Sequence, residues 1–378
     1  MKNIKTLSDH AIYDRIVGMP SSASVEAWIE QAQLIHRQDP IDALGGFNEL
    51  TQHLAAEVAA ALGLPYHSPA VIRRTRDKAE MRRTLQAAGV DSTAARLVHD
   101  GNEVAAFGED YGFPIVLKPV DGRASSGVSI IRSHAEIPAA IAWFEQGAAG
   151  QQMLAEQFLA GEEWSVESFS EGGQHHIICV TQKFKDPQTS VETGHCLPAP
   201  VTKDVRSCLE AFVHAVLNAI GLENGPSHTE VILTADGPRL VETHARLGGD
   251  NIVDLIALTS GVDLDLLWIR QVAGEQVLHE VPGTINRWAA IAYATPRAVG
   301  TLERIEGLSD AREKAGIVRV NLLQEPGTYL RGASDSFGRG ASAIALADDP
   351  AEAINQARAA VQSLTFIITC GGNDGAGS

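Results

Sequence analysis

Val241-Glu-Thr-His-Ala-Arg-Leu-Gly-Gly-Asp250 is the stretch of sequence that decides the fold. Apolar and polar residues alternate along its first half, which is the period of a β-strand with one apolar and one polar face. On such a strand Glu242, His244 and Arg246 share the polar face, and a Gly-Gly turn follows. A carboxylate can hold Mg²⁺, and a guanidinium neutralises the charge of oxyanions. The stretch therefore predicts a site for metal-bound phosphate.

The residues before this strand predict its partner. They are also strand-like, and a three-residue loop at residues 235–237, with glycine in the left-handed position, would join the two strands as a hairpin. That loop sets Glu230 opposite Glu242 and Ile232 opposite Leu240, whereas a two-residue loop would send the two carboxylates to opposite faces. Facing carboxylates repel each other unless a cation lies between them. We therefore predict that both glutamates bind a metal ion; a half-exposed hairpin with scattered charges is the alternative.

Composition places the chain among ordinary globular proteins of two or three domains. Its 378 residues are 44% hydrophobic and 20% charged, and its net charge of −17 argues against nucleic acid or an anionic membrane as the main partner. The four cysteines lack the spacing of a metal site and are typical of reduced thiols. The sequence has no apolar run of membrane-spanning length and no signal-peptide core at its start, so we expect a cytoplasmic protein.

Strand-like and helix-like segments alternate along the chain, which predicts an α/β and α+β multidomain architecture. Residues 41–47 indicate a short strand that runs into a glycine turn, and residues 54–62 indicate an Ala-rich helix. Further helices are expected at residues 77–89, 209–221, 251–273 and 350–363, and further strands at residues 113–120, 128–131, 153–159, 163–169 and 176–184.

Lys118 ends an apolar strand and precedes a loop of small residues, Asp121 to Gly127. Backbone N–H groups in such a loop can approach phosphate oxygens closely, and the lysine adds a positive charge. The loop has neither the glycine spacing of a phosphate loop nor that of a dinucleotide fold. Taken alone, Lys118 is better explained by a side chain that extends from a strand end into solvent.

The order of several loose motifs along the chain resembles the ATP-grasp superfamily. The motifs run from about residue 65 to residue 274 and are Lys78 at a helix start, Lys118 before the small-residue loop, the run Glu156-Gln-Phe-Leu-Ala-Gly-Glu-Glu-Trp-Ser-Val166, and Glu230 and Glu242 with Arg246. The resemblance implies an ATP site between two α+β halves. It assigns phosphate binding to Lys78, Lys118 and a lid loop at Ser125, Ser126 and Gly127, adenine binding to a hinge at Glu156, Phe158 and Leu159, ribose binding to Glu163, and Mg²⁺ or Mn²⁺ binding to Glu230 and Glu242.

Within the superfamily the chain is most similar to the L-amino-acid ligases, or dipeptide synthetases, and related carboxylate–amine ligases. Glu192-Thr-Gly-His-Cys-Leu-Pro-Ala199 is similar to their substrate-side loop, and Gly316 to Leu322 with Ala341 to Ala347 resembles their small closing domain. His244 stands where many members have a metal-binding asparagine, so it is left out of the predicted metal shell.

The resemblance implies an ATP-dependent ligase that joins a small-molecule carboxylate to an amine through an acylphosphate. Arg246 would stabilise the transferring phosphoryl group, and His195 would contact the reacting carboxyl or the incoming amine. An ATP-grasp carboxylase, a purine-type ligase and a non-catalytic ATP-binding protein are the alternatives, and a homodimer is left open. The expected domains are an abbreviated N-terminal α/β domain at residues 1–68, the ATP-grasp region at 69–274, a closing domain at 275–369 and a disordered tail at 370–378.

Overall fold

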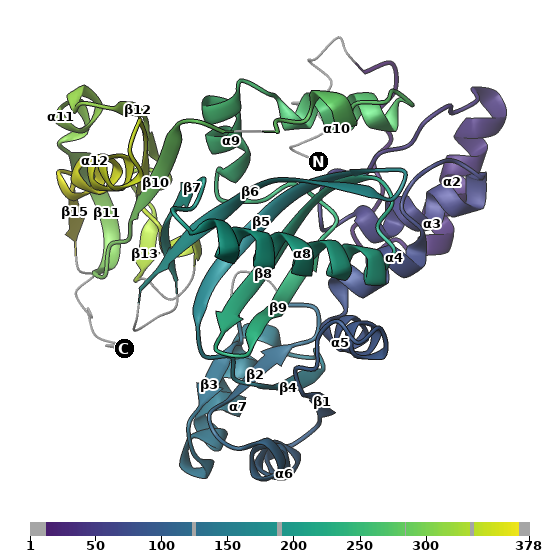
Figure 1. The fold of residues 1–378 in the computed structure, drawn as a ribbon, viewed down its shortest axis with the longest axis horizontal. Helices are drawn as coiled ribbons and strands as arrows, with labels where there is room; N and C mark the ends of the chain where they lie inside the picture. The colour runs from purple at the N-terminus through teal and green to yellow at the C-terminus, as the bar shows by residue number, and fades with distance from the viewer. Residues whose placement is uncertain (1–12, 123–125, 187–190, 284, 333–335, 370–378) are drawn as a thin grey trace, which may run out of the picture.

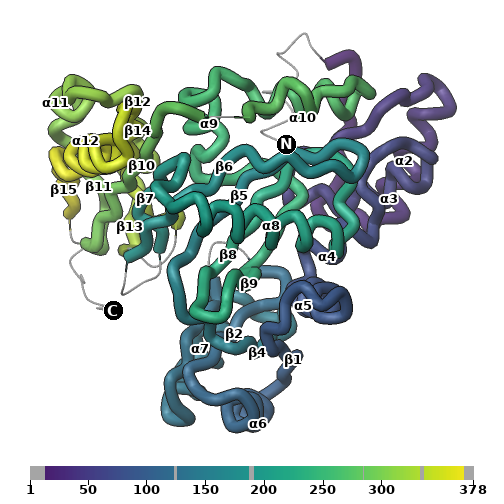
Figure 2. The backbone as a smooth tube through the Cα atoms, in the orientation of Figure 1, coloured from purple at the N-terminus to yellow at the C-terminus, as the bar shows by residue number. Residues whose placement is uncertain are grey.

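A computed structural model describes residues 13–122, 126–186, 191–283, 285–332 and 336–369, and the structural statements below concern those residues. A long central sheet lies between an N-terminal group of helices and a C-terminal lobe, with a smaller sheet beneath it (Figures 1 and 2). Ser125 and the tail at residues 370–378 fall outside the described part of the chain.

The central sheet has eight strands in the order β12-β14-β10-β7-β6-β5-β8-β9, and its neighbouring strands are antiparallel. Their bounds are β5 Glu162–Glu171, β6 Gln174–Lys185, β7 Glu192–Leu197, β8 Gly225–Thr234, β9 Gly237–His244, β10 Trp288–Ala294, β12 Ile317–Leu322 and β14 Ala341–Ala347. The strands predicted at residues 163–169 and 176–184 are confirmed as parts of β5 and β6.

Helix α8 (Lys203–Ile220) packs across the central sheet, as Figure 1 shows. The Thr202 side chain caps its N-terminus, and Gly221, in the left-handed conformation, ends it. Apolar residues three or four positions apart bury one face of α8 against strands β5, β8 and β9. A second core lies under α9 (Ile252–Ser260) and α10 (Leu264–Val272), which pack on Phe169 of β5 and Ile178 of β6.

The smaller sheet has the order β1-β4-β2-β3, and helices α6 and α7 cover it. Its elements are β1 Ala95–Val98, α6 Gly101–Tyr111, β2 Ile115–Pro119, β3 Ser129–Ile131, the 3₁₀ turn η1 His134–Glu136, α7 Ile137–Ala148 and β4 Met153–Gln157. Strand β2 and its return strand β3 confirm the strands predicted at residues 113–120 and 128–131. Helix α5 (Lys78–Ala87) begins at an Asp77 cap, also as predicted.

The N-terminal part is helical, with α2 (Val25–Gln38), α3 (Gln52–Leu62) and α4 (Pro69–Arg76). The strand predicted at residues 41–47 was wrong, because that segment has no regular structure. It packs closely on α3 instead: a Cβ atom at Gly46 would lie 2.6 Å from the Cβ of Ala55. The Tyr66 hydroxyl donates to the Gly46 carbonyl at 2.8 Å, so this backbone group has a partner without a sheet.

The C-terminal lobe is built on the end of the central sheet. Helix α12 (Pro350–Gln362) packs its alanines against β10 and β14, which allows a close approach. A separate sheet has the order β13-β11-β15. The remaining elements are η2 Leu278–Glu280, β11 Val299–Glu306, α11 Leu308–Glu313, β13 Tyr329–Arg331, η3 Ser336–Gly338 and β15 Thr365–Thr369. The domain limits at residues 68, 274 and 369 stay predictions.

Crossing a lipid bilayer would require a longer and more apolar helix than any in the described part of the chain.

Candidate active site

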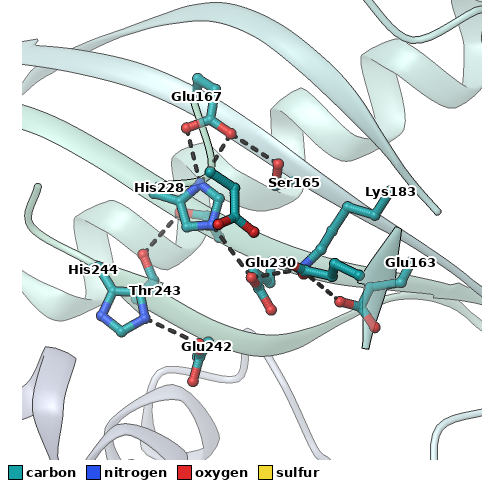
Figure 3. A network of polar contacts seen from close by, with 12 residues as sticks. Glu163, Ser165, Glu167, Lys183, His228, Glu230, Glu242, Thr243 and His244 are labelled. Atoms are coloured by element: carbon teal, nitrogen blue, oxygen red, sulfur yellow. Dashed lines mark hydrogen bonds and ion pairs between the residues drawn. The ribbon is translucent and has the colours of Figure 1, made fainter. Parts of the chain in front are cut away.

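Glu230 and Glu242 are direct partners on β8 and β9, as the sequence predicts. His228 and His244 form the pair two residues away on the same face of the hairpin. Figure 3 shows these four side chains close together. The hairpin therefore presents two carboxylates and two imidazoles, in facing pairs.

The predicted hairpin loop was wrong. Thr234 pairs with Gly237, so the loop holds two residues rather than three. Ile232 accordingly faces Arg239 and not Leu240. A two-residue loop alone would not pair the carboxylates, so the register must change further along the hairpin.

That change is a β-bulge at Val241. Val231 pairs with Leu240 and Glu230 pairs with Glu242, so β9 contributes one extra residue between the two pairs. A bulge places two residues opposite one and re-aims the side chains that follow it. The bulge, and not a longer loop, therefore sets Glu230 opposite Glu242.

His228 is held as a cation behind Glu230. Its Nδ1 lies 2.9 Å from Glu167 Oε2, and its Nε2 lies 3.3 Å from Glu230 Oε1 (Figure 3). Burial by itself would lower the pKa of His228, but the charge and hydrogen bond of Glu167 outweigh it and raise the pKa to about 10. An imidazole that is protonated at neutral pH both orients Glu230 and partly neutralises it.

Lys78, at the start of α5, contacts the second carboxylate of the hairpin. Its Nζ lies 3.0 Å from Glu242 Oε2 and donates to the Gly122 carbonyl at 3.1 Å. Burial would raise the pKa of Glu242, but the charges of Lys78 and His244 outweigh it and hold the pKa well below its usual range. Lys78 thus links the loop after β2 to the predicted metal ligands.

Lys118 is buried and does not extend into solvent, which corrects the alternative explanation of this residue. Its Nζ lies 2.6 Å from Glu156 Oε2, and the Arg82 guanidinium binds both oxygens of the same carboxylate at 2.9 and 3.1 Å. Burial would raise the pKa of Glu156, but Arg82 and then Lys118 lower it to about 2. The Glu156 side chain is therefore committed to this ion cluster.

Lys183 of β6 was missed by the sequence analysis. Its buried ammonium lies 2.8 Å from Glu163 Oε1, 2.7 Å from Glu192 Oε1 and 2.6 Å from Glu230 Oε1. Burial would lower the pKa of Lys183, but the surrounding carboxylates raise it well above its usual value. Glu163, the predicted ribose ligand, also contacts Lys185 through its second oxygen at 2.5 Å.

His195 of β7 lies buried beside Asp250. Its Nε2 is 3.4 Å from Asp250 Oδ2, and its buried Nδ1 has no hydrogen-bond partner in the part of the chain that the structure describes. Arg339, from the C-terminal lobe, holds both oxygens of Asp250 at 2.7 and 3.0 Å. A buried nitrogen without a partner is the kind of atom that a bound substrate would satisfy.

Arg246 lies just beyond the end of β9. Its Nε and Nη2 contact Glu49 Oε2 at 2.8 and 2.6 Å, and its Nη1 donates to the Leu247 carbonyl at 2.9 Å. Asp250, four residues further along the chain, is held by Arg339 instead. Arg246 also lines the pocket described in the next paragraph.

One pocket of about 310 Å³ brings much of the predicted site together. Its lining includes four predicted residues, which are His195, Glu230, Glu242 and Arg246, and several that were not predicted, which are Lys183, Glu192, His228 and Asp250. Glu163 contacts the lining residue Lys183, and Lys78 contacts the lining residue Glu242. Lys118 and Glu156 form the neighbouring ion cluster in the smaller sheet.

The remaining predicted residues that the structure describes do not line this pocket. Ser126 donates its hydroxyl to the Gly147 carbonyl at 3.0 Å, and Gly127 has a left-handed backbone with φ of 71°. Phe158 and Leu159 follow β4 and are half-buried. Their roles in nucleotide binding stay predictions.

The carboxylate oxygens of the pocket fit a hard divalent cation. Glu163, Glu192 and Glu230 each offer an oxygen within 4.8 Å of the others, and Glu192, His195 and Asp250 form a second such group. Carboxylates are the ligands that Mg²⁺ and Mn²⁺ prefer. The donor set therefore agrees with the predicted metal.

Comparison with known proteins identifies two domains in this chain. A family described as ATP-grasp domain matches residues 111–254, and one described as L-amino acid ligase C-terminal domain 2 matches residues 292–369. The alanine–anticapsin ligase of Bacillus subtilis is 27% identical over 63% of this chain and 55% of its own length. The dapdiamide A synthase of Enterobacter agglomerans is 24% identical over 73% of this chain and 68% of its own length.

A solved structure agrees over nearly the whole chain. The L-amino acid ligase of Bacillus licheniformis superposes with a TM-score of 0.81 at 23% identity and covers 94% of this chain and 88% of that one. The chain thus has the ATP-grasp fold, and its named relatives are ligases. It carries an ATP-grasp domain and, after it, a C-terminal domain of the L-amino acid ligase type. It spans only about half the length of the alanine–anticapsin ligase that it matches.

Proposed function

We propose that this protein is an ATP-dependent carboxylate–amine ligase that forms an amide or peptide bond and releases ADP and phosphate. The observation that carries the proposal is the single pocket in which the paired carboxylates Glu230 and Glu242 lie with His195 and Arg246. The paired carboxylates can hold the metal ion that phosphoryl transfer requires. His195 and Arg246 can stabilise the negative charge that develops during acyl transfer. Amino acids are the proposed substrates, because the relatives with a matching C-terminal domain are L-amino acid ligases.

The nucleotide would lie between the smaller sheet and the central sheet. Lys78 and Lys118 would contact phosphates, Glu163 would bind the ribose, and the backbone at residues 156–159 would bind adenine. The burial of both lysines supports their roles, since a charge-assisted contact is stronger where water is excluded. The loop at residues 125–127 would cover the phosphates.

The reaction has two steps. A carboxylate oxygen of the first substrate attacks the γ-phosphorus of ATP, the bond from that phosphorus to the β–γ bridging oxygen breaks, and ADP leaves an acylphosphate behind. The amine of the second substrate then attacks the acyl carbon, the bond to the phosphate oxygen breaks, and the amine loses a proton. The products are an amide, ADP and phosphate.

Residues of this chain would supply positioning and charge. Arg246 would stabilise the charge of the transferring phosphoryl group and of the tetrahedral oxyanion. His195, whose Nδ1 is unpartnered among the described residues, would bind the reacting carboxyl or accept the proton of the amine. Glu230 and Glu242 would hold Mg²⁺, with Mn²⁺ as a substitute, and the bound ion would neutralise phosphate charge.

The test is phosphate release from ATP against a panel of amino-acid pairs. We expect release that needs both amino acids, together with an amide product detected by mass spectrometry. Release that needs bicarbonate would indicate a carboxylase, and ATP binding without turnover would indicate a non-catalytic protein. We place the enzyme in the cytoplasm, in keeping with the free thiols of Cys179, Cys196 and Cys208.

A further inference from the structure

The ammonium of Lys183 occupies a cage of carboxylates in the candidate active site. Glu163, Glu192 and Glu230 each place one oxygen 2.6 to 2.8 Å from its Nζ. The same three residues form one of the groups whose oxygens lie close enough together to hold a metal ion. Lys183 therefore stands where a divalent cation would otherwise find its ligands.

A second cation contacts each of these carboxylates from outside the cage. Lys185 contacts Glu163 at 2.5 Å, Arg339 contacts Glu192 at 3.4 Å, and His228 contacts Glu230 at 3.3 Å. The cage is thus balanced by side-chain charges of the protein itself. A free metal ion entering it would meet an ammonium at contact distance, and like charges at that separation repel strongly where water is scarce.

Lys183 and His228 contact the same oxygen of Glu230. Glu230 Oε1, the oxygen nearest Lys183, is also the oxygen nearest His228, so a metal ion must displace one of these cations to use it. His228 is anchored at its other nitrogen by Glu167, whereas Lys183 ends a flexible chain of methylene groups. Of these two cations, Lys183 is therefore the one that can move away from Glu230.

We propose that Lys183 is an internal counter-ion that keeps divalent metal out of the free protein and yields Glu230 only when nucleotide phosphates arrive to bind its ammonium. Metal and nucleotide then enter together, as the metal complex of a nucleoside triphosphate. This inference rests on the proposed function, because it takes Glu230 as a ligand of the nucleotide-bound metal. It adds that the site selects the metal–nucleotide complex over the free ion.

Metal binding without nucleotide tests the proposal. Mn²⁺ binding to the nucleotide-free protein, followed by electron paramagnetic resonance, should be at least ~10-fold tighter in Lys183→Met than in wild type, because removal of one charge opens the three-carboxylate cage. Lys185→Met is the matched control, since this lysine on the same strand contacts only Glu163 within the cage. An unchanged Mn²⁺ affinity in a folded Lys183→Met protein would overturn the proposal.

A measurement on the wild-type side chain covers the case in which Lys183→Met does not fold. In protein labelled with ¹⁵N-lysine, the Lys183 ammonium resonance, assigned with Lys183→Arg, should stay in place on addition of Mg²⁺ alone. It should move on addition of Mg²⁺ with a non-hydrolysable ATP analogue. Movement with Mg²⁺ alone, at the same concentration, would contradict the proposal.

Neither measurement involves an amino acid or an amide product. Failure of the proposed ligase reaction would therefore leave these results unaffected. Conversely, a ligase with tight binding of free metal and a stationary Lys183 signal would refute only the counter-ion role.

Discussion

Glu230 and Glu242 face each other across β8 and β9 because β9 carries one extra residue, Val241, between two regular pairs. The pairing brings two negative charges together on one face of the sheet, which is unfavourable without a compensating cation. Lys78 and Lys183 supply that compensation in the structure, one for each carboxylate. Each carboxylate of the hairpin therefore has a lysine ammonium as its counter-ion.

The paired carboxylates should both be needed for the metal–nucleotide complex. We expect Glu230→Gln and Glu242→Gln each to weaken Mn²⁺ binding, in the presence of a non-hydrolysable ATP analogue, by at least about tenfold. Asp236→Asn, at the exposed tip of the same hairpin, is the control and should leave binding unchanged. Isothermal titration calorimetry measures these affinities, and a normal affinity in either glutamine variant would remove that residue from the metal shell.

Lys118→Met should affect both ATP binding and stability, because the structure buries Lys118 against Glu156. Loss of one contact to a charged group costs roughly 1.5–3 kcal/mol, which corresponds to an ATP affinity reduced by about 10–150-fold. We expect a stability loss of the same order in urea unfolding, and Lys118→Arg should recover more of the stability than of the affinity. Full ATP affinity in Lys118→Met would retire the phosphate-binding role.

Arg246→Ala should cost rate more than binding. Charge stabilisation that develops in the transition state is worth about 10²–10³ in turnover for each donor, so amino-acid-dependent phosphate release should fall by that factor. ATP affinity should stay near normal, and thermal melting should shift by only a few degrees. Arg270→Ala removes a half-buried arginine that pairs with Glu280, and it provides the stability control. A large drop in melting temperature with an unchanged rate would leave Arg246 as a structural residue bound to Glu49.

Acid should destabilise the protein through Glu156. Its pKa falls from 4.5 to about 2 on folding, so its ionised form contributes stability that is fully present above about pH 4.5 and is lost as the pH falls toward 2. A shift of that size corresponds to roughly 3 kcal/mol of unfolding free energy. Glu156→Gln should be less stable than wild type at pH 7 and should lose less further stability between pH 4.5 and pH 2. Parallel curves of unfolding free energy against pH would show that Glu156 does not titrate as described.

Periodicity and chain order were enough to predict the central elements of the fold. The alternation indicated the two strands of the hairpin, and the order of motifs indicated the ATP-grasp fold. The pairing of Glu230 with Glu242 was predicted from a three-residue loop and is confirmed, although the structure reaches it through a bulge. The hairpin loop was wrong because a bulge at Val241 has the same local sequence as a regular strand. The strand at residues 41–47 was wrong because glycines that permit close packing on α3 resemble the glycines of a strand-ending turn.

The ion-pair partners in the site could not be predicted, because they come from distant parts of the chain. Lys183 lies on β6 and meets Glu230 only through the order of strands in the sheet. Arg246 meets Glu49 from the N-terminal part, and Asp250 meets Arg339 from the C-terminal lobe. His228 did carry a local signal, since it precedes Glu230 by two residues on the same face.

Transfer of oxygen from substrate to phosphate is the measurement that tests the proposed reaction most directly. An amino acid with ¹⁸O at both carboxylate oxygens should be incubated with ATP, Mg²⁺, the enzyme and an unlabelled amine substrate, and the phosphate should be analysed by mass spectrometry. An acylphosphate pathway predicts one ¹⁸O atom in each phosphate released and one amide formed with it. Phosphate released without ¹⁸O, or with no amide, would show that ATP is not used to activate a carboxylate and would contradict the proposed function.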